Sequence, residues 1–264
     1  MRLIILGSGS SGNSVYIESG ATSVLVDVGL SAKETARRMV EVGLDPSQLD
    51  AIIVTHEHSD HFKGVPVMSK TAGVRVFISD ATRAVCKLGG KGADMYWGEA
   101  ITSSRSFQVG ELDFHPFTIP HDGVDTFALT VQSNGVKAAI VTDLGYITQL
   151  VAERLRGCNL ILIESNHDRD MLKVGRYPWS VKQRIASNLG HLANDETARW
   201  IRQDFDGQAE YLVLVHLSRH ANHPELARLA ALQALDKHGT LFYPNAERRV
   251  KIARHDRVSE WFEF

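Results

Sequence analysis

The chain alternates between short runs of apolar, β-branched residues and longer segments in which apolar residues recur every three or four positions. Runs of the first kind, bounded by turn-forming residues, predict strands of about four to eight residues. The predicted strands are residues 3–6, 15–17, 24–28, 51–54, 74–78, 112–119, 127–131, 138–141, 160–163 and 212–215. Segments of the second kind predict helices over residues 32–42, 147–155, 180–189, 195–204 and 224–237. The pattern is therefore that of an α/β protein.

Only tight turns separate the first three predicted strands, which argues against a purely alternating arrangement of strands and helices. No fixed-period repeat, low-complexity segment or linker rich in glycine and proline divides the chain. We therefore expect residues 1–264 to form one domain with mixed sheets.

The composition is that of an ordinary folded protein. Of 264 residues, 44% are hydrophobic and 23% are charged, and the net charge of −2 excludes an overall basic coat for nucleic acid, although not a local basic face. No apolar run approaches the roughly 18 residues of a membrane span, and the amino terminus does not resemble a signal peptide. Cys86 and Cys158 fit a reducing compartment. We expect a cytoplasmic protein without a membrane partner.

A glycine-rich loop follows the first predicted strand. Residues 7–12 read Gly-Ser-Gly-Ser-Ser-Gly, which matches the G-x-G-x-x-G pattern of dinucleotide sites. In those sites a helix follows the last glycine, whereas here a strand-like run follows Gly12. The sequence therefore favours a turn between two strands, in which glycine permits positive φ, over a nucleotide site.

Histidine is the residue type that points most directly to chemistry, because imidazole is the commonest metal ligand and the chain has 12 histidines. His56, His58, Asp60 and His61 lie within six residues, directly after a predicted strand. Burying these groups without a cation is unfavourable, because desolvation and repulsion oppose their charged forms. At a strand end His56 and His58 can point the same way, and the following turn directs Asp60 and His61 to a second position. The loop therefore predicts two metal sites.

The H-x-H-x-D-H spacing of this loop resembles that of the metallo-β-lactamase superfamily, and the resemblance spans nearly the whole chain. It implies an αββα sandwich, in which two mixed sheets pack face to face, helices lie outside and metals bind at one edge.

The resemblance also implies ligands from later strand ends. His121 matches the third ligand of the first site, Asp143 the carboxylate between both metals, and His216 the last ligand of the second site. Asp27 matches an aspartate that orients the histidine loop from behind. The implied ligand set is His56, His58, Asp60, His61, His121, Asp143 and His216. Taken singly, Asp27 and Asp143 also fit turn caps, and the later histidines fit buried structural roles.

Two metals about 3.5 to 4 Å apart can hold a bridging water and lower its pKa towards about 7, which suits phosphodiester hydrolysis by hydroxide. Zinc, manganese and iron all fit the donor set. The leaving alkoxide needs a proton. Gly190-His191 before a predicted helix resembles the ribonuclease Z group and implies that His191 contacts the phosphate or donates that proton, whereas a capping histidine is the alternative. The predicted catalytic residues are Asp60, Asp143 and His191.

A closer resemblance is to the YycJ/WalJ-type branch of the superfamily, whose members are DNA exonucleases that work from 5′ ends. It rests on residues 7–14, the ESNHD run at 164–168, the RYPW run at 176–179, and the GHL and HLS triplets at 190–192 and 216–218. The chain departs from the branch at Ala193 and Ala221, where serine and asparagine are usual, and these departures leave the substrate contacts less certain than the ligands.

Local charge agrees with a nucleic acid substrate, and the branch resemblance favours DNA. Residues 168–184 hold five basic and two acidic side chains. Basic side chains bind phosphates and aromatic ones stack on bases, although a solvated helix face is the alternative. The predicted substrate contacts are His167, Arg176, Tyr177, Trp179, Lys182, Arg184, Ser218 and Asn222. For His167 a structural role is equally compatible with the sequence.

The first hypothesis is thus a two-metal phosphodiesterase that digests DNA from 5′ to 3′. A rival is a hydrolase of the same fold that cleaves a small ester, thioester or cyclic phosphodiester, and a third class is a non-enzymatic module that binds metal or nucleotide. The sequence leaves open the metal, DNA against RNA, the direction of digestion and the oligomeric state, with which a homo-oligomer is compatible.

Overall fold

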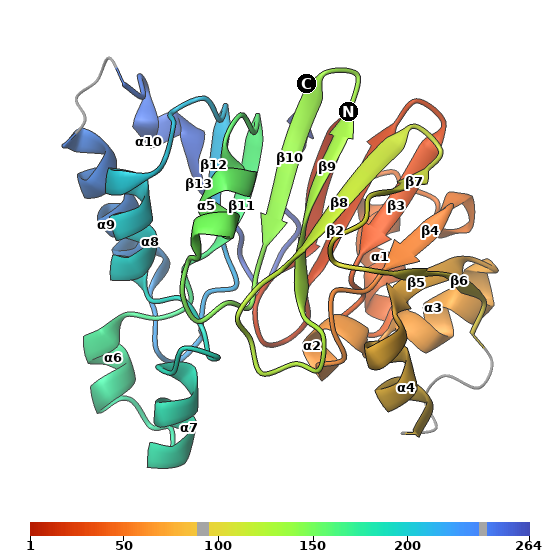
Figure 1. The fold of residues 1–264 in the computed structure, drawn as a ribbon, viewed down its shortest axis with the longest axis horizontal. Helices are drawn as coiled ribbons and strands as arrows, with labels where there is room; N and C mark the ends of the chain where they lie inside the picture. Colours follow the sequence, from red (N-terminus) through yellow and green to blue (C-terminus); the bar gives the residue numbers. More distant parts are fainter. Residues whose placement is uncertain (89–94, 238–241) are drawn as a thin grey trace.

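Two mixed β-sheets packed face to face form the centre of the molecule, and helices cover their outer faces (Figure 1). This computed structural model describes residues 1–88, 95–237 and 242–264. Within those residues each sheet has seven strands. The arrangement confirms the expected αββα sandwich.

Both sheets follow the order of the chain closely, and β14 joins the first sheet from the far end of the sequence. In spatial order, the first sheet contains β14 (Phe262–Glu263), β1 (Arg2–Gly7), β2 (Ser14–Ser19), β3 (Thr22–Val26), β4 (Ala51–Ile53), β5 (Arg75–Ser79) and β6 (Trp97–Ile101). The second contains β13 (Val250–Ile252), β12 (Tyr211–Val215), β11 (Leu160–Glu164), β10 (Val136–Val141), β9 (Phe127–Ser133), β8 (Leu112–Thr118) and β7 (Phe107–Val109). Strands β3 to β6 run parallel to one another, and so do β10 to β13.

The helices begin and end where local sequence signals place them. Ser31 caps α1 (Ala32–Glu41) by accepting a hydrogen bond from the amide of Glu34, and α9 (Pro224–Asp236) has proline in its first turn. The other helices are η1 (Pro46–Gln48), α2 (Ser59–Phe62), α3 (Val65–Ala72), α4 (Asp80–Leu88), α5 (Gln149–Leu155), α6 (Arg169–Val174), α7 (Trp179–Ile185), α8 (Asn194–Gln203) and α10 (Ala246–Arg249). Among the described helices, none has the length and apolar character needed to cross a bilayer.

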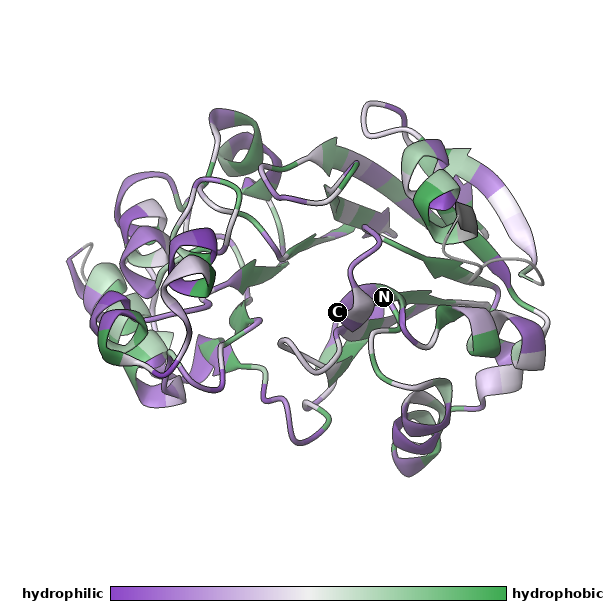
Figure 2. Ribbon diagram, turned by 90° about the horizontal axis from the view of Figure 1, so that it is seen from below, coloured by the Kyte–Doolittle hydropathy of each residue, from purple (hydrophilic) through white to green (hydrophobic). Residues whose placement is uncertain are grey.

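Both faces of each sheet are buried. In β1, Leu3 and Ile5 pack between the sheets, whereas Ile4 and Leu6 pack beneath the helices. Figure 2 shows the apolar strands enclosed by helices with polar outer surfaces. This double burial explains why the strands appear in the sequence as continuous apolar runs.

All strands predicted from the sequence are present, with ends shifted by at most two residues. The sequence missed β6, β7, β13 and β14, which are short or mix polar with apolar residues, and it also missed η1, α2, α3, α4, α6 and α10. Strand β14 forms by pairing with β1 across almost the whole chain, with Arg2 opposite Glu263, and no local pattern encodes such a contact. The helix predicted over residues 180–189 ends at Ile185, because the chain turns back there towards Gly190.

Candidate metal centre

Polar side chains follow the carboxyl ends of the strands at one edge of the sandwich. Because these strands are parallel within each sheet, their ends meet at that edge. Strand β3 leads to Asp27, β4 to the histidine loop and β8 to His121; β10 leads to Asp143, β11 ends at Glu164 and β12 leads to His216.

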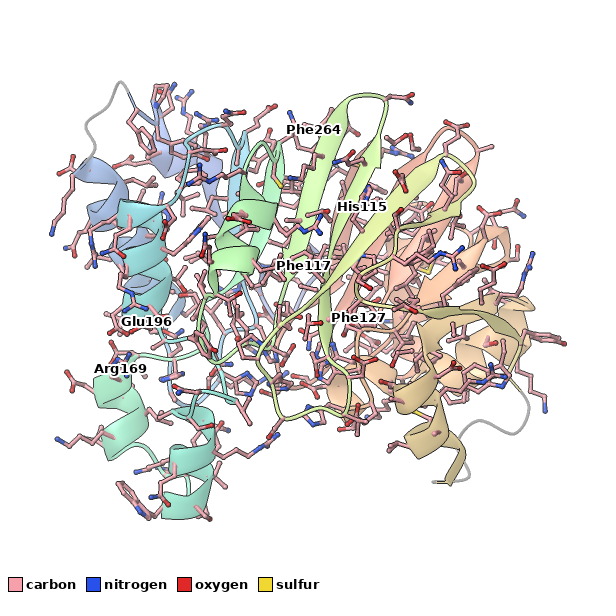
Figure 3. The ribbon with its side chains drawn as sticks, viewed as in Figure 1. His115, Phe117, Phe127, Arg169, Glu196 and Phe264 are labelled. Atoms are coloured by element: carbon pink, nitrogen blue, oxygen red, sulfur yellow. The ribbon has the colours of Figure 1, made fainter. Side chains whose placement is uncertain are left out.

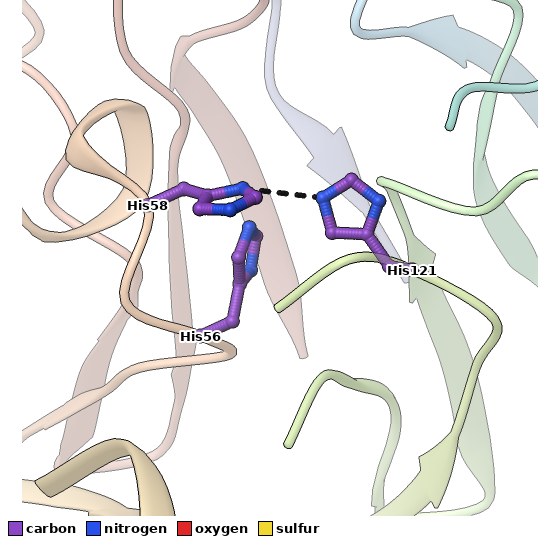
Figure 4. A group of neighbouring side chains, drawn as sticks. All are labelled: His56, His58 and His121. Atoms are coloured by element: carbon purple, nitrogen blue, oxygen red, sulfur yellow. Dashed lines mark hydrogen bonds between the residues drawn. The ribbon is translucent and has the colours of Figure 1, made fainter. Parts of the chain in front are cut away.

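Three imidazoles form the first cluster (Figure 4). His56, His58 and His121 each offer a ring nitrogen within 4.8 Å of the others, and His121 Nε2 lies 3.2 Å from His58 Nδ1. Nε2 of His56 is buried and has no hydrogen-bond partner among the described residues. Burial, with the neighbouring His61 ring, holds the pKa of His56 well below its ordinary value, so this imidazole is neutral. Neutral imidazole nitrogens in this arrangement fit a divalent cation.

Two carboxylates and two imidazoles form the second cluster. Asp60, His61, Asp143 and His216 offer ligand atoms within 4.8 Å of one another. Asp143 Oδ2 lies 2.9 Å from His61 Nε2, and Asp60 Oδ2 lies 3.5 Å from His216 Nε2. Nε2 of His216 is buried without a hydrogen-bond partner in the described part of the chain. This donor set fits a second divalent cation.

Asp143 lies between the clusters. Its Oδ1 is 3.9 Å from His121 Nε2 in the first cluster, and its Oδ2 contacts His61 in the second. The ring centroids of His56 and His61 are only 4.2 Å apart. The two clusters are therefore adjacent, and one carboxylate reaches both.

A buried carboxylate holds each imidazole of the second cluster from behind. Asp27 Oδ2 lies 2.7 Å from His61 Nδ1, and Glu164 Oε1 lies 2.6 Å from His216 Nδ1. In the neutral form of each ring, which is the form that would bind a cation, the proton on Nδ1 leaves the lone pair of Nε2 facing the cluster. Asp27 also accepts a hydrogen bond from the amide of Thr55, which fixes the start of the histidine loop.

The charges of the second cluster compensate one another. Burial disfavours imidazolium, but Asp143 and the carboxylates nearby raise the pKa of His61 and His216 well above the ordinary value. Burial also opposes the Asp143 carboxylate, but His216 and His61 hold its pKa well below the ordinary value. Without cations, protons on the imidazoles balance the carboxylates, and a cation would take their place.

Glu164 is a site residue to which the sequence analysis gave no role. It is fully buried, and its Oε2 accepts hydrogen bonds from the amides of Leu144 (3.0 Å) and Leu192 (3.1 Å). Burial opposes its ionisation, yet His191 and His216 lower its pKa to about 2, so it is a carboxylate. The signal was its place at the carboxyl end of an apolar strand, the same signal that favoured Asp143.

His191 lies at the opening between the two clusters. Its Nδ1 is 3.0 Å from Glu164 Oε1, and its ring lies 5.4 Å from the ring of His121 and 5.1 Å from that of His216. The ring is partly exposed, with 17% of the side chain accessible. Glu164 therefore orients His191 and His216 with the same oxygen.

The glycine-rich loop supports the histidine loop from below. The Asn13 amide donates to the Asp60 carbonyl (2.7 Å), and the Asn13 side chain lies 2.9 Å from His61 Nε2. A Cβ on Gly29, in the segment after β3, would lie 1.6 Å from the same Asp60 carbonyl oxygen, so this segment also packs closely against the histidine loop. A turn between β1 and β2 is confirmed, and the helix of a dinucleotide site is absent from these described residues.

A family profile described as Beta-lactamase superfamily domain matches residues 22–217. The chain belongs to the metallo-β-lactamase superfamily. It is 33% identical to Exodeoxyribonuclease YycJ of Bacillus anthracis, covering 90% of both chains, and 35% identical to Exodeoxyribonuclease WalJ of Streptococcus pneumoniae, covering 88% of this chain and 87% of the other.

Solved structures of the superfamily share the fold at low sequence identity. YhfI from Bacillus subtilis superposes with a TM-score of 0.73 at 18% identity, covering 98% of this chain and 99% of that one. Zn(2+)-bound PqqB from Methylobacterium extorquens superposes with a TM-score of 0.71 at 15% identity over the full length of both. Together with the clusters, membership of this superfamily makes the protein a metal-dependent hydrolase.

Most of the predicted substrate contacts lie on one hairpin beside the metal edge of this hydrolase. Helices α6 and α7 project from the body in Figure 1, and the segment between and within them carries Arg176, Tyr177, Trp179, Lys182 and Arg184. The Trp179 side chain is 70% exposed. The Tyr177 hydroxyl lies 3.4 Å from Ser218 Oγ, so the hairpin also brings the predicted Ser218 into the same region.

His167 and Asn222 lie below the surface instead. His167 is 1% exposed, and burial lowers its pKa to about 4. The Asn222 amide donates to the carbonyls of Ser165 and Asn166, both at 2.9 Å, and ties the ends of β11 and α9 together. In this conformation both side chains are buried, and the substrate role predicted for them stays a prediction.

Metal binding is expected to release protons. The raised pKa values of His61 and His216 mean that these rings carry protons at neutral pH, and a cation at Nε2 displaces them. Affinity for Zn²⁺ or Mn²⁺ therefore falls as pH is lowered. Calorimetric titration in buffers of different ionisation enthalpy measures the protons released. Metal binding that is independent of pH between about 6 and 8 would contradict this assignment.

Glu164→Gln is expected to weaken the second cluster. The glutamine side chain is neutral. Its NH₂ group would face hydrogen-bond donors in either orientation, namely two backbone N–H groups or two imidazole N–H groups. Affinity for the second metal should fall about 10–100-fold, with turnover falling alongside. Metal content measured against free metal concentration checks this, and Glu153→Gln at an exposed position of α5 is the control. Unchanged metal affinity would refute the orienting role.

Proposed function

We propose that this hydrolase is a two-metal phosphodiesterase that degrades DNA as an exonuclease, from 5′ to 3′. The observation that carries the proposal is the pair of adjacent clusters with Asp143 between them. The likeness to the exodeoxyribonucleases YycJ and WalJ, which covers 90% and 88% of this chain, supports DNA as the substrate. The direction rests on resemblance to the YycJ/WalJ-type branch alone.

In this proposal each residue of the clusters has a defined task. His56, His58 and His121 would hold the first cation. Asp60, His61 and His216 would hold the second, and Asp143 would contribute to both sites. Two divalent cations, when bound, supply an activated water and stabilise charge that develops on the phosphate oxygens. The buried carboxylates of Asp27 and Glu164 keep the ligand nitrogens aimed at the cations.

His191 is the proposed proton donor for the leaving oxygen. Glu164 holds Nδ1, so Nε2 is the nitrogen left to face the scissile phosphate. Leaving alkoxides of nucleotides are strongly basic and depart readily only with a proton. The partial exposure of the ring beside both clusters is compatible with this transfer.

The α6–α7 hairpin is the proposed path of the DNA strand. Trp179 offers an exposed ring for base stacking, and Arg176 and Lys182 offer positive charge to the backbone phosphates. Lys182 Nζ already donates to the Lys173 carbonyl at 2.7 Å, an arrangement that keeps its charge while joining the two helices.

End-labelled DNA tests the proposal. With Mn²⁺ or Zn²⁺ added, the protein should shorten single-stranded or duplex DNA stepwise, and a 5′ label should appear first in mononucleotides. Single-stranded RNA and bis-p-nitrophenyl phosphate are the comparison substrates. Turnover of the small ester alone would refute the nuclease proposal, and early release of a 3′ label would refute the direction.

Loss of the His191 imidazole should affect DNA more than an ester with a good leaving group. His191→Ala is expected to lower kcat on DNA about 10²- to 10⁴-fold, and to lower it much less on bis-p-nitrophenyl phosphate, because p-nitrophenolate leaves without protonation. His115→Ala is the control, since His115 lies on β8 away from the clusters (Figure 3). Equal losses on both substrates, or loss of metal from His191→Ala, would contradict proton donation.

A further inference from the structure

Helix α7 contacts the metal edge through an ion pair of Arg184 and through its last turn, where the Ile185 carbonyl accepts a hydrogen bond from the His191 amide. None of its residues is buried. Arg184 Nε lies 2.5 Å from Asp122 Oδ2, and Arg184 Nη2 lies 3.1 Å from Asp122 Oδ1. The guanidinium thus forms a bidentate contact with the carboxylate, and arginine binds phosphate with the same geometry.

The same carboxylate faces the first cluster on its other side. Asp122 Oδ1 lies 3.4 Å from His121 Nε2 and 3.5 Å from His58 Nε2. The Asp122 side chain is 28% exposed, so water and ligands reach it. A two-oxygen anion therefore stands between the cluster that would hold a cation and an arginine on the hairpin. A phosphate group of the substrate is also an anion, and it would be stabilised at the same place, between a cation and the Arg184 guanidinium.

We propose that Asp122 occupies the position of a substrate phosphate at Arg184 and is displaced when DNA binds, so that Asp122 determines which substrates the site accepts. The inference rests on the proposed function and deepens it. An exposed ion pair contributes little to stability, so exchanging the carboxylate for a phosphate is energetically accessible.

The size of the substrate then determines how readily its phosphate displaces Asp122 from Arg184. A DNA strand contacts the hairpin at several points, because Arg176, Lys182 and the exposed Trp179 lie on the same segment as Arg184. These contacts hold a phosphate near Arg184 at high local concentration. A small phosphodiester lacks them and has to displace Asp122 unaided. Asp122 therefore selects polyanionic strands against small phosphodiesters.

The test measures binding of a nuclease-resistant phosphorothioate single strand to the metal-loaded protein. Asp122→Asn keeps the shape of the side chain but removes the competing charge. Its Kd for the strand should fall about two- to fivefold, and the slope of log Kd against log salt should steepen by about one. Arg184→Ala should weaken binding, and Asp122→Asn should give no gain in the Arg184→Ala background.

Asp195→Asn is the matched control. Arg169 at the start of α6 contacts both carboxylate oxygens of Asp195 through Nε, at 3.0 and 2.8 Å, and its Nη2 contacts Glu196, which Figure 3 shows beside it on α8. This pair holds the other end of the hairpin. Asp195→Asn should leave Kd unchanged, because Arg169 remains held by Glu196.

Three results would overturn the inference. An equal gain from Asp122→Asn with and without Arg184 would mean that Asp122 only repels DNA. Loss of metal from Asp122→Asn would assign the carboxylate to the metal site, and an unchanged Kd would remove its competing role. Because the strand resists cleavage, these results are independent of turnover. Failure of wild-type protein to cleave ordinary DNA would count against the proposed function alone.

Discussion

Compensation of buried charge is the constraint on which the metal edge depends. Asp27, Asp143 and Glu164 place carboxylates at positions that are at most 3% exposed. Desolvation alone would protonate such groups, but imidazoles face each of them at hydrogen-bond distance. Each charge is thus stabilised only while its partners stay in place. Removing one leaves another buried and unpaired, which is why such clusters behave as a unit.

The sandwich brings these groups together because it fixes where strands end. Apolar residues on both faces of β4, β10, β11 and β12 hold the strands in register, and the chain leaves them at a common edge. Asp27, Asp143 and His216 have φ values of 61°, 62° and 56°, a left-handed conformation that is uncommon outside glycine. These sharp turns direct the side chains inward, and packing of the strands offsets the strain.

The sequence predicted the parts of the fold and site that local pattern encodes. Apolar runs indicated the central strands, and the dense histidine loop supplied both clusters with their first members. Short edge strands such as β14 were not predicted, because the strands that they pair with lie far away in the chain. Glu164 was not predicted as a site residue, because a single glutamate at the end of a strand forms no motif with a recognisable spacing. His167 and Asn222 were singled out because they belong to recognisable motifs, but their burial depends on tertiary packing that no local pattern shows.

The metal edge and the α6–α7 hairpin differ in how firmly they are held. The clusters sit on strands whose apolar faces are buried, whereas α7 buries no residue and is joined to the edge by the Arg184–Asp122 ion pair and one backbone hydrogen bond between Ile185 and His191. Local opening of the hairpin therefore requires far less free energy than disturbing the ligands. Hydrolytic chemistry in this fold needs fixed ligand geometry, but choosing a substrate needs only surface contacts that exchange partners. Because the two requirements fall on different elements, substitutions on the hairpin can change the substrate while the arrangement of the clusters is preserved.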